Sequence, residues 1–246
     1  TGCAGTGAAA GGSAGTVSAG TRPAGAGHAL RGGVGVVARS GAAGTRPAGA
    51  SRARGGLGSS LSYALGASGI GRISVVDFDT VALHNIHRQI LFTLEDEGKF
   101  KADIFKSRTE SRYDGVSVEV HKSRAEEFFA SAIGSGEKFD LILDATDNLA
   151  TRAQIDAFAK QIGVPWVFAS VDSWQCQVCF VQNADFKFFP SLNATPAGIT
   201  AAIVMFAASF EANLALRYLA GLEVEKDLLY YANFFDGELE VRKIKL

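Results

Sequence analysis

Long apolar runs, an even set of cysteines and a large net charge are all absent from this 246-residue chain. The longest apolar run, AAIVMFAASFEANLAL, is interrupted by Ser209, Glu211 and Asn213, so we expect no transmembrane helix. Three cysteines, an odd number, disfavour a secreted disulfide framework, and we expect a cytoplasmic protein. The formal net charge of −1 gives no reason to expect binding to nucleic acid or to a membrane.

Acidic residues are missing from the first 50 positions, as are Lys, Asn, Gln, Ile, Phe, Tyr, Trp and Met. This stretch holds 15 Gly and 14 Ala, and it contains GTRPAGA twice. So few large side chains cannot offset the entropy of ordering the chain. We therefore predict that residues 1–54 form a mostly disordered low-complexity segment, with strand character only at GGVGVVA (32–38).

Two other interpretations of residues 1–54 remain open. The segment is rich in Arg and poor in acids, as organellar targeting peptides are, although its Gly and Pro content argues against an amphipathic helix. It can also be a misread sequence that is not native. The chain begins with Thr and not with Met, which indicates a fragment, a processed form or an incomplete sequence. The six arginines in this segment leave the remainder with a charge of about −7.

Residues 55–246 alternate between strand and helix patterns, and they are numerous enough to bury one core. Strands are predicted at 72–78, 116–122, 139–146, 164–170, 176–182, 186–190, 228–235 and 238–246. Helices are predicted after the Gly-rich turn at 55–58, ending at Gly69 or Gly71, and at 99–113, 124–133, 149–162 and 200–220. Helices between nearly continuous apolar strands indicate parallel crossovers. We predict a Rossmann-like, doubly wound α/β fold, with a mainly parallel sheet and antiparallel C-terminal extension strands.

A Gly-rich turn and an acidic residue suggest a nucleotide site. ARGGLG (53–58) opens a predicted helix, and Asp77 closes the next strand 19 residues after Gly58. Glycines let the backbone approach a phosphate at a helix N-terminus, and the acid accepts hydrogen bonds from ribose hydroxyls. The first position of the G-x-G-x-x-G pattern is Ala53, however, so the pattern alone also fits a strand–helix turn without a ligand.

Further motifs follow in a fixed order. They are DFD (77–79), NIHRQ (85–89), GKFKA (98–102) and DATDNLATR (144–152). With GGLG they closely resemble the ubiquitin-activating-enzyme-like superfamily, the ThiF/MoeB/HesA adenylyltransferases. The resemblance is strong over 55–170 and fainter at PAGI (196–199) and SFEANLALRYLAG (209–221). It implies ATP- and Mg²⁺-dependent adenylation of the C-terminal Gly-Gly carboxylate of a ubiquitin-like sulfur-carrier protein, in thiamine or molybdenum-cofactor synthesis, by a homodimer.

The resemblance also implies a set of ATP-binding residues. It assigns the ribose hydroxyls to Asp77 and the triphosphate to Arg88 and Lys101. Attack of the carboxylate on the α-phosphorus, with departure of pyrophosphate, spreads negative charge over phosphate oxygens that a cation in a dehydrated site stabilises. These residues also fit a purely structural role without a ligand, in which Lys101 shares a solvated helix face with Lys99. The remaining expected cofactor-binding residues in this half of the chain are Gly55, Gly56, Gly58, Asp79, Asn85 and Gln89.

Asp147 resembles the family's magnesium ligand, and a carboxylate at the end of a strand suits Mg²⁺, which takes one or two carboxylates plus phosphate oxygens. Its catalytic partners are then Arg88 and Lys101. We expect Asn148 to contribute to the cofactor site and to brace the loop with Arg152, or simply to start a helix. Asp144, inside the strand, is expected to be structural.

A zinc site is not expected. Cys176 and Cys179 form C-x-x-C, but the strand pattern places them on opposite faces, and only Cys3 is left as a further thiol. His84 and His87 fit a polar loop better than a metal site.

Two family features are missing. Members that form a thioester or a persulfide carry a cysteine shortly before the segment that aligns with Ala197–Ile199, where this chain has Ala194 and Thr195. Nothing in 1–54 matches the family's N-terminal R-Y-x-R-Q segment, whose arginine enters the partner's ATP site. Two other functions stay open. Family members without the cysteine can be the non-catalytic scaffold subunit of an activating heterodimer, and the Gly-rich turn with Asp77 also fits an NAD-dependent oxidoreductase.

Overall fold

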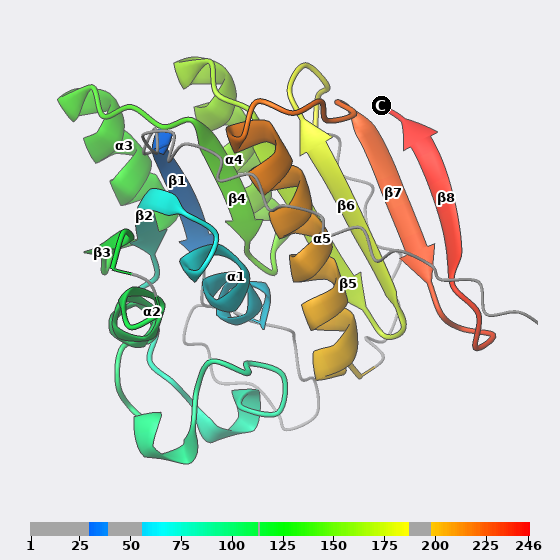
Figure 1. The fold of residues 1–246 in the computed structure, drawn as a ribbon, viewed down its shortest axis with the longest axis horizontal. Coiled ribbons are helices and arrows are strands. Elements are labelled where there is room, and N and C mark those ends of the chain that lie inside the picture. Colours follow the sequence, from blue (N-terminus) through cyan, green and yellow to red (C-terminus); the bar gives the residue numbers. More distant parts are fainter. Residues whose placement is uncertain (1–29, 39–55, 113, 187–197) are drawn as a thin grey trace, which may run out of the picture.

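An eight-stranded sheet forms the centre of the molecule in the computed structural model, which describes residues 30–38, 56–112, 114–186 and 198–246 (Figure 1). The strand order is β3-β2-β1-β4-β5-β6-β7-β8. The first five strands in this order run parallel: β3 (Ser117–His121), β2 (Ile70–Val76), β1 (Leu30–Ala38), β4 (Leu141–Ala145) and β5 (Trp166–Asp172). The last three are antiparallel: β6 (Gln175–Val181), β7 (Leu228–Asn233) and β8 (Glu240–Lys245). The predicted mixed α/β sheet is confirmed.

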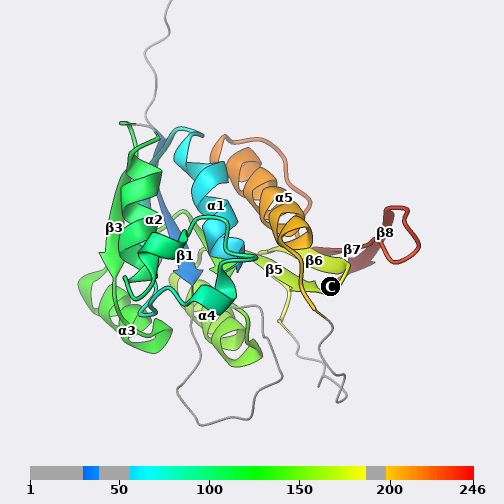
Figure 2. The same cartoon turned by 90° about the horizontal axis from the view of Figure 1, so that it is seen from below.

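Helices cover both faces of the sheet (Figure 2). One face is packed by α1 (Gly56–Gly66), α2 (Lys101–Glu110) and α5 (Ala201–Leu219), and the buried residues there form one apolar cluster. The other face is packed by α3 (Ala125–Ser135) and α4 (Leu149–Ile162) around a second cluster rich in phenylalanine. Strand residues alternate between the two clusters, as the pleat requires. For example, Leu143 belongs to the first cluster and Ile142 to the second.

The strand predicted at 32–38 is confirmed as β1, and it lies between β2 and β4. The sheet therefore draws on residues that precede position 55. The chain passes from β1 through α1 to β2 on one side, and it later enters β4 on the other side of β1. In such sheets ligands bind at the carboxyl edge where the direction of winding reverses. That position here is the edge between β1 and β4.

Most of the helix boundaries agree with the prediction, and α4 spans the predicted 149–162. Gly163, with φ +71°, ends α4 in the left-handed conformation that glycine adopts readily. The prediction that the first helix ends at Gly69 or Gly71 is wrong, because α1 ends at Gly66. The reason is that Gly69, at φ +79°, belongs to the turn before β2. Helix α2 begins at Lys101 and not at Lys99, because Lys99 takes part in a backbone pairing with Val81.

Two short 3₁₀ helices, η1 (Leu83–Asn85) and η2 (Leu94–Asp96), lie in the loop between β2 and α2. Helix α5 is long and apolar enough to cross a membrane, but core helices meet the same criteria, and its inner face packs against the sheet. Of the predicted strand at 186–190, all but the first residue lies outside the described residues. Residues 1–29 and 39–54 also lie outside them.

Candidate functional site at the carboxyl edge of the sheet

Asp77 follows β2 directly and is buried, with 4% of its surface exposed. Its carboxylate accepts a hydrogen bond from the Asp79 backbone N–H (2.8 Å). Burial raises the pKa of Asp77 to about 7, and the nearby Lys101 ammonium partly opposes the shift. A carboxylate held in this way gains most from ligand groups that donate hydrogen bonds, since few water molecules can reach it.

The backbone brings Asp79 and Lys101 together. The loop between β2 and α2 is closed at its base, where Lys101 N donates to Asp79 O (2.9 Å) and Val81 N donates to Lys99 O (2.9 Å). The Lys101 ammonium lies 3.1 Å from the Asp79 carboxylate. Only 4% of the Lys101 side chain is exposed, against 55% for Lys99. The alternative in which Lys101 shares a solvated helix face with Lys99 is therefore wrong, because the base of the loop directs Lys101 toward the sheet edge.

Arg88, Asn85 and Gln89 lie within the same loop and are all buried. Arg88 Nη2 donates to Asn85 Oδ1 (2.8 Å), and the backbone N–H of Gln89 donates to Asn85 O (3.1 Å). The Gln89 side chain is fully buried, and its amide has no hydrogen-bond partner within the described residues. His84 and His87 are exposed, as expected for a polar loop.

The N-terminus of α1 reaches this loop. A Cβ atom on Gly56 would lie 2.9 Å from Val204 Cγ1 of α5 and 3.5 Å from the Arg88 carbonyl oxygen. Gly58 shares a small cavity with Asp77 and Lys101. The helix opening therefore meets the acid after β2 and both candidate cations, and its N-terminal amides favour an anion. Gly55 lies outside the described residues.

Asp147 and Asn148 follow β4 at the same sheet edge. Val37 of β1 is in register with both Val76 of β2 and Asp144 of β4, so β2 and β4 are two strands apart. Two strand spacings correspond to roughly 10 Å. Asn148 caps α4, since its side-chain oxygen accepts a hydrogen bond from Thr151 N (2.9 Å). The helix-start role of Asn148 is thus confirmed, while its contact with a cofactor remains a prediction.

Asp144 and Arg152 hold the turn that carries Asp147. Asp144 Oδ1 accepts hydrogen bonds from the backbone N–H (2.8 Å) and the hydroxyl (2.6 Å) of Thr146. Arg152 Nε donates to Asp144 Oδ2 (2.7 Å), and Arg152 Nη2 donates to Thr146 O (2.9 Å) and Ala169 O (2.8 Å). The predicted structural roles of Asp144 and Arg152 are confirmed.

Cys176 and Cys179 are both buried in β6 and belong to the clusters on opposite faces of the sheet. Burial raises the pKa of Cys176 to about 11 and that of Cys179 to about 12. Because the two thiols lie on opposite faces of the sheet, they cannot bind one metal ion together. Among the described residues there is no group of three or more His, Cys, Asp or Glu arranged to hold a metal ion by themselves.

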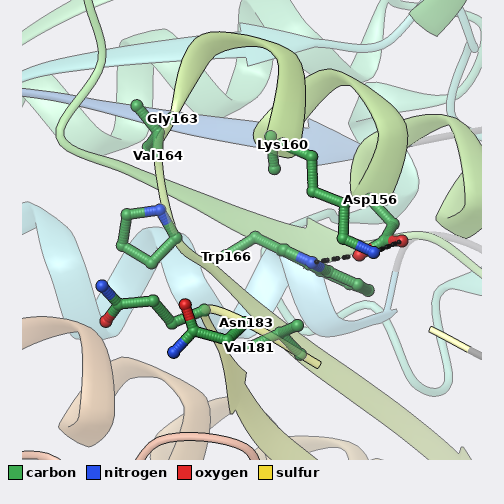
Figure 3. Close-up of a pocket in the computed structure, with 10 residues that line it drawn as sticks. Asp156, Lys160, Gly163, Val164, Trp166, Val181 and Asn183 are labelled. Atoms are coloured by element: carbon green, nitrogen blue, oxygen red, sulfur yellow. Dashed lines mark hydrogen bonds and ion pairs between the residues drawn. The ribbon is translucent and has the colours of Figure 1, made fainter. Parts of the chain in front are cut away.

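Sequence reasoning missed several cavities, of which two border α4. One, of about 260 Å³, lies beside Trp166 (Figure 3). The Asp156 carboxylate there accepts hydrogen bonds from the Trp166 indole N–H (3.2 Å) and from the Lys160 ammonium. It lies at the amino end of β5, away from the predicted site. The other, of about 530 Å³, lies on the α4 face and includes Arg152, Phe168, Gln177 and Leu229 in its lining. No residue spacing indicated it, because its walls come from separate segments of the chain.

A helix opened by glycines and a buried acid at the carboxyl edge of a parallel sheet are features of the α/β proteins that bind nucleotides. The comparison with known families is more specific. The family model described as "ThiF family" matches residues 54–246, and the chain belongs to this family.

Several characterised proteins are similar to this chain. A sulfur carrier protein adenylyltransferase of Thermus thermophilus is 36% identical over 124 residues, which are 50% of this chain and 45% of that protein. The sulfur carrier protein ThiS adenylyltransferase of Escherichia coli is 29% identical over 75% of each chain. A molybdopterin-synthase adenylyltransferase of Haemophilus influenzae is 29% identical over 78% of this chain and 82% of its own. The chain thus spans about half the length of the first of these relatives.

Solved structures show the same fold. PaaA superposes with a TM-score of 0.68 at 20% identity, over 88% of this chain and 64% of its own. Escherichia coli MccB, solved with ATP, has a TM-score of 0.67 at 16% identity over 88% and 64%. At this identity the likeness concerns the fold alone.

Proposed function

We propose that the protein is an adenylyltransferase that activates the C-terminal carboxylate of a ubiquitin-like sulfur-carrier protein ending in Gly-Gly, with MgATP. The observation that carries this proposal is the meeting of four features at one sheet edge: the Gly56–Gly58 helix opening, Asp77, Arg88 and the Asp79–Lys101 pair. Relatives named as sulfur carrier adenylyltransferases support the reaction type. Relatives of both the thiamine and the molybdopterin type are similar, so the pathway is left open.

The site residues suit the parts of MgATP. Asp77 would accept hydrogen bonds from the ribose hydroxyls, and the α1 N-terminus would receive a phosphate. Lys101 and Arg88 would lie along the triphosphate, where cations stabilise the charge that develops as the carrier carboxylate attacks the α-phosphorus and pyrophosphate leaves. Asp147, partly exposed at the end of β4, offers the single carboxylate that Mg²⁺ needs in addition to phosphate oxygens.

We propose that the carrier tail binds in a cavity next to this site. The cavity of about 530 Å³ opens beside Arg152, next to the turn that carries Asp147, and extends over β5, β6 and β7. Its mixed lining of Phe168, Leu229 and Gln177 suits an extended peptide. We further propose a Rossmann-like site architecture, a homodimer and a cytoplasmic location. Residues 194 and 195 lie outside the described residues, and adenylation needs no cysteine there.

Carrier-dependent exchange between pyrophosphate and ATP tests the proposal. Lys101→Met should reduce exchange by about 100-fold or more, since one cation in a dehydrated site commonly contributes that much. Lys99→Met is the matched control, because Lys99 is two residues away but exposed, and it should keep exchange within about 2-fold. Asp147→Ala should abolish exchange, and it should raise the Mg²⁺ concentration that MgATP binding requires.

The outcomes separate the alternatives. Equal activity of the Lys101 and Lys99 variants would contradict the assigned role of Lys101. A folded protein that binds MgATP but exchanges with no Gly-Gly carrier would instead be a scaffold subunit. Preferential binding of NADH over ATP in a fluorescence titration would indicate an oxidoreductase.

A further inference from the structure

Glu211 is a buried acid in the middle of α5 for which the proposed reaction has no use. It is fully buried, with 0% of its surface exposed. Among the described residues, neither carboxyl oxygen has a side-chain hydrogen-bond donor, and the backbone N–H of Asp144 is a hydrogen-bond donor to the carboxyl group. Burying a carboxyl group with so few partners is costly, so a residue of this kind calls for a specific reason.

The surroundings of Glu211 supply that reason. Strands β4 and β5 are paired only at Ile142–Trp166 and Leu143–Val167, so their ladder ends before the carboxyl edge. Arg152 enters this opening from the α4 face and bridges it, because its guanidinium donates to Thr146 O beyond β4 and to Ala169 O on β5. Helix α5 packs on the other face, against both strands.

Glu211 lies close enough to the Asp144–Arg152 pair to interact with both charges. Burial, followed by the Asp144 carboxylate, raises the pKa of Glu211 well above its ordinary value, while the Arg152 guanidinium and the hydrogen bond from the Asp144 backbone N–H partly oppose the rise. Arg152 is already paired with Asp144 at 2.7 Å, so its charge is shared. An ionised Glu211 would give this buried group of three side chains a net charge of −1, whereas a neutral Glu211 leaves the group balanced.

We propose that Glu211 is a positioning residue, which acts from the α5 face to hold the Asp144–Arg152 pair in place and, through that pair, the turn that carries Asp147. This inference rests on the proposed role of Asp147 as the Mg²⁺ ligand. The connection is short, since Asp144 and Arg152 both bond Thr146, and Thr146 precedes Asp147. A neutral acid supplies a polar group to the opening without adding a buried charge.

Binding of MgATP to the full chain at a series of Mg²⁺ concentrations tests this role. Glu211→Gln keeps the shape and the neutral polar group, so the Mg²⁺ concentration for half-saturation should change less than about 2-fold. Glu211→Leu removes the polar group, and the Mg²⁺ requirement should rise about 5- to 10-fold, with the affinity recovered at saturating Mg²⁺. The matched control is Leu65→Ala, which removes buried bulk at the C-terminal end of α1 and should lower the melting temperature without changing the Mg²⁺ requirement.

Infrared spectroscopy provides a readout that needs no nucleotide. The wild-type protein at pH 8 should show a band of a protonated carboxylic acid that Glu211→Gln removes. An unchanged Mg²⁺ requirement in Glu211→Leu, or an equal rise in Leu65→Ala, would overturn the positioning role while leaving the adenylation proposal intact. A wild-type protein that does not bind MgATP would refute both proposals, whatever the infrared band shows.

Discussion

Gly56 is the position at which packing makes the sharpest prediction. Any Cβ there would lie 2.9 Å from Val204 Cγ1, closer than side chains normally approach. Val204 is fully buried and cannot swing into solvent. Overpacking of this kind costs about 1–3 kcal/mol, and the better helix propensity of Ala returns at most about 1 kcal/mol. We therefore expect Gly56→Ala to lower the free energy of unfolding by about 1–2 kcal/mol, or the melting temperature by roughly 2–8 °C.

The double variant with Val204→Ala shows whether Val204 is the cause. Val204→Ala alone should cost about 2 kcal/mol, because it removes two buried methyl groups and leaves a cavity. In the double variant the methyl group introduced at position 56 occupies part of that space. The combined loss should then be smaller than the sum of the separate losses by about 1–2 kcal/mol.

Urea denaturation measures all three variants, and Gly134→Ala is the control. Gly134 is an exposed glycine of α3, and a Cβ there meets nothing within 4 Å. That substitution should stabilise the protein by about 0.5–1 kcal/mol. The packing argument fails if Gly56→Ala is as stable as the wild type, or if its effect and that of Val204→Ala add to within about 0.5 kcal/mol.

Three further predictions concern buried charges and thiols. The pKa of Asp77 is about 7 in the folded protein against 3.8 normally, so the free energy of unfolding of the wild type should fall between pH 4 and 7 by as much as about 4 kcal/mol relative to Asp77→Asn, with no further fall above pH 7. Urea denaturation of both proteins across this pH range measures the difference, and the same pH dependence in both would contradict the prediction. In a Cys3→Ser background, Cys176 and Cys179 should resist thiol reagents at pH 8 until the protein is unfolded, and labelling of the native protein would show that the thiols are accessible. Arg152→Met should cost about 3–5 kcal/mol in urea denaturation, because it leaves a buried carboxylate without its partner, and a loss below about 1 kcal/mol would mean that the pair is solvated.

Much of the fold follows from local patterns. The helix at 149–162 is predictable residue by residue, since Asn148 caps one end and Gly163 ends the other, and both signals are local. The apolar strands are predictable from their periodicity. The mixed parallel and antiparallel sheet then follows from helices that alternate with strands and from a final hairpin.

The site is predictable only in part. The position of Asp77 follows from the sequence because this residue closes a buried strand, and strand ends meet at one edge in a parallel sheet. Sequence spacing cannot distinguish Lys101 from Lys99, since the pairing of Asp79 with Lys101 depends on how the loop between them closes. Which of the two lysines faces the site is a matter of tertiary contact.

By itself, the sequence determined the elements, their order and the residue types at the sheet edge, because caps, glycines and apolar periodicity act over a few residues. Only the tertiary structure decided where β1 lies, that α1 meets Val204 of α5, and that the buried Glu211 of α5 comes close to Asp144 and Arg152. These contacts join segments that are far apart in the chain, and they depend on side-chain volume and buried charge, which no local pattern encodes.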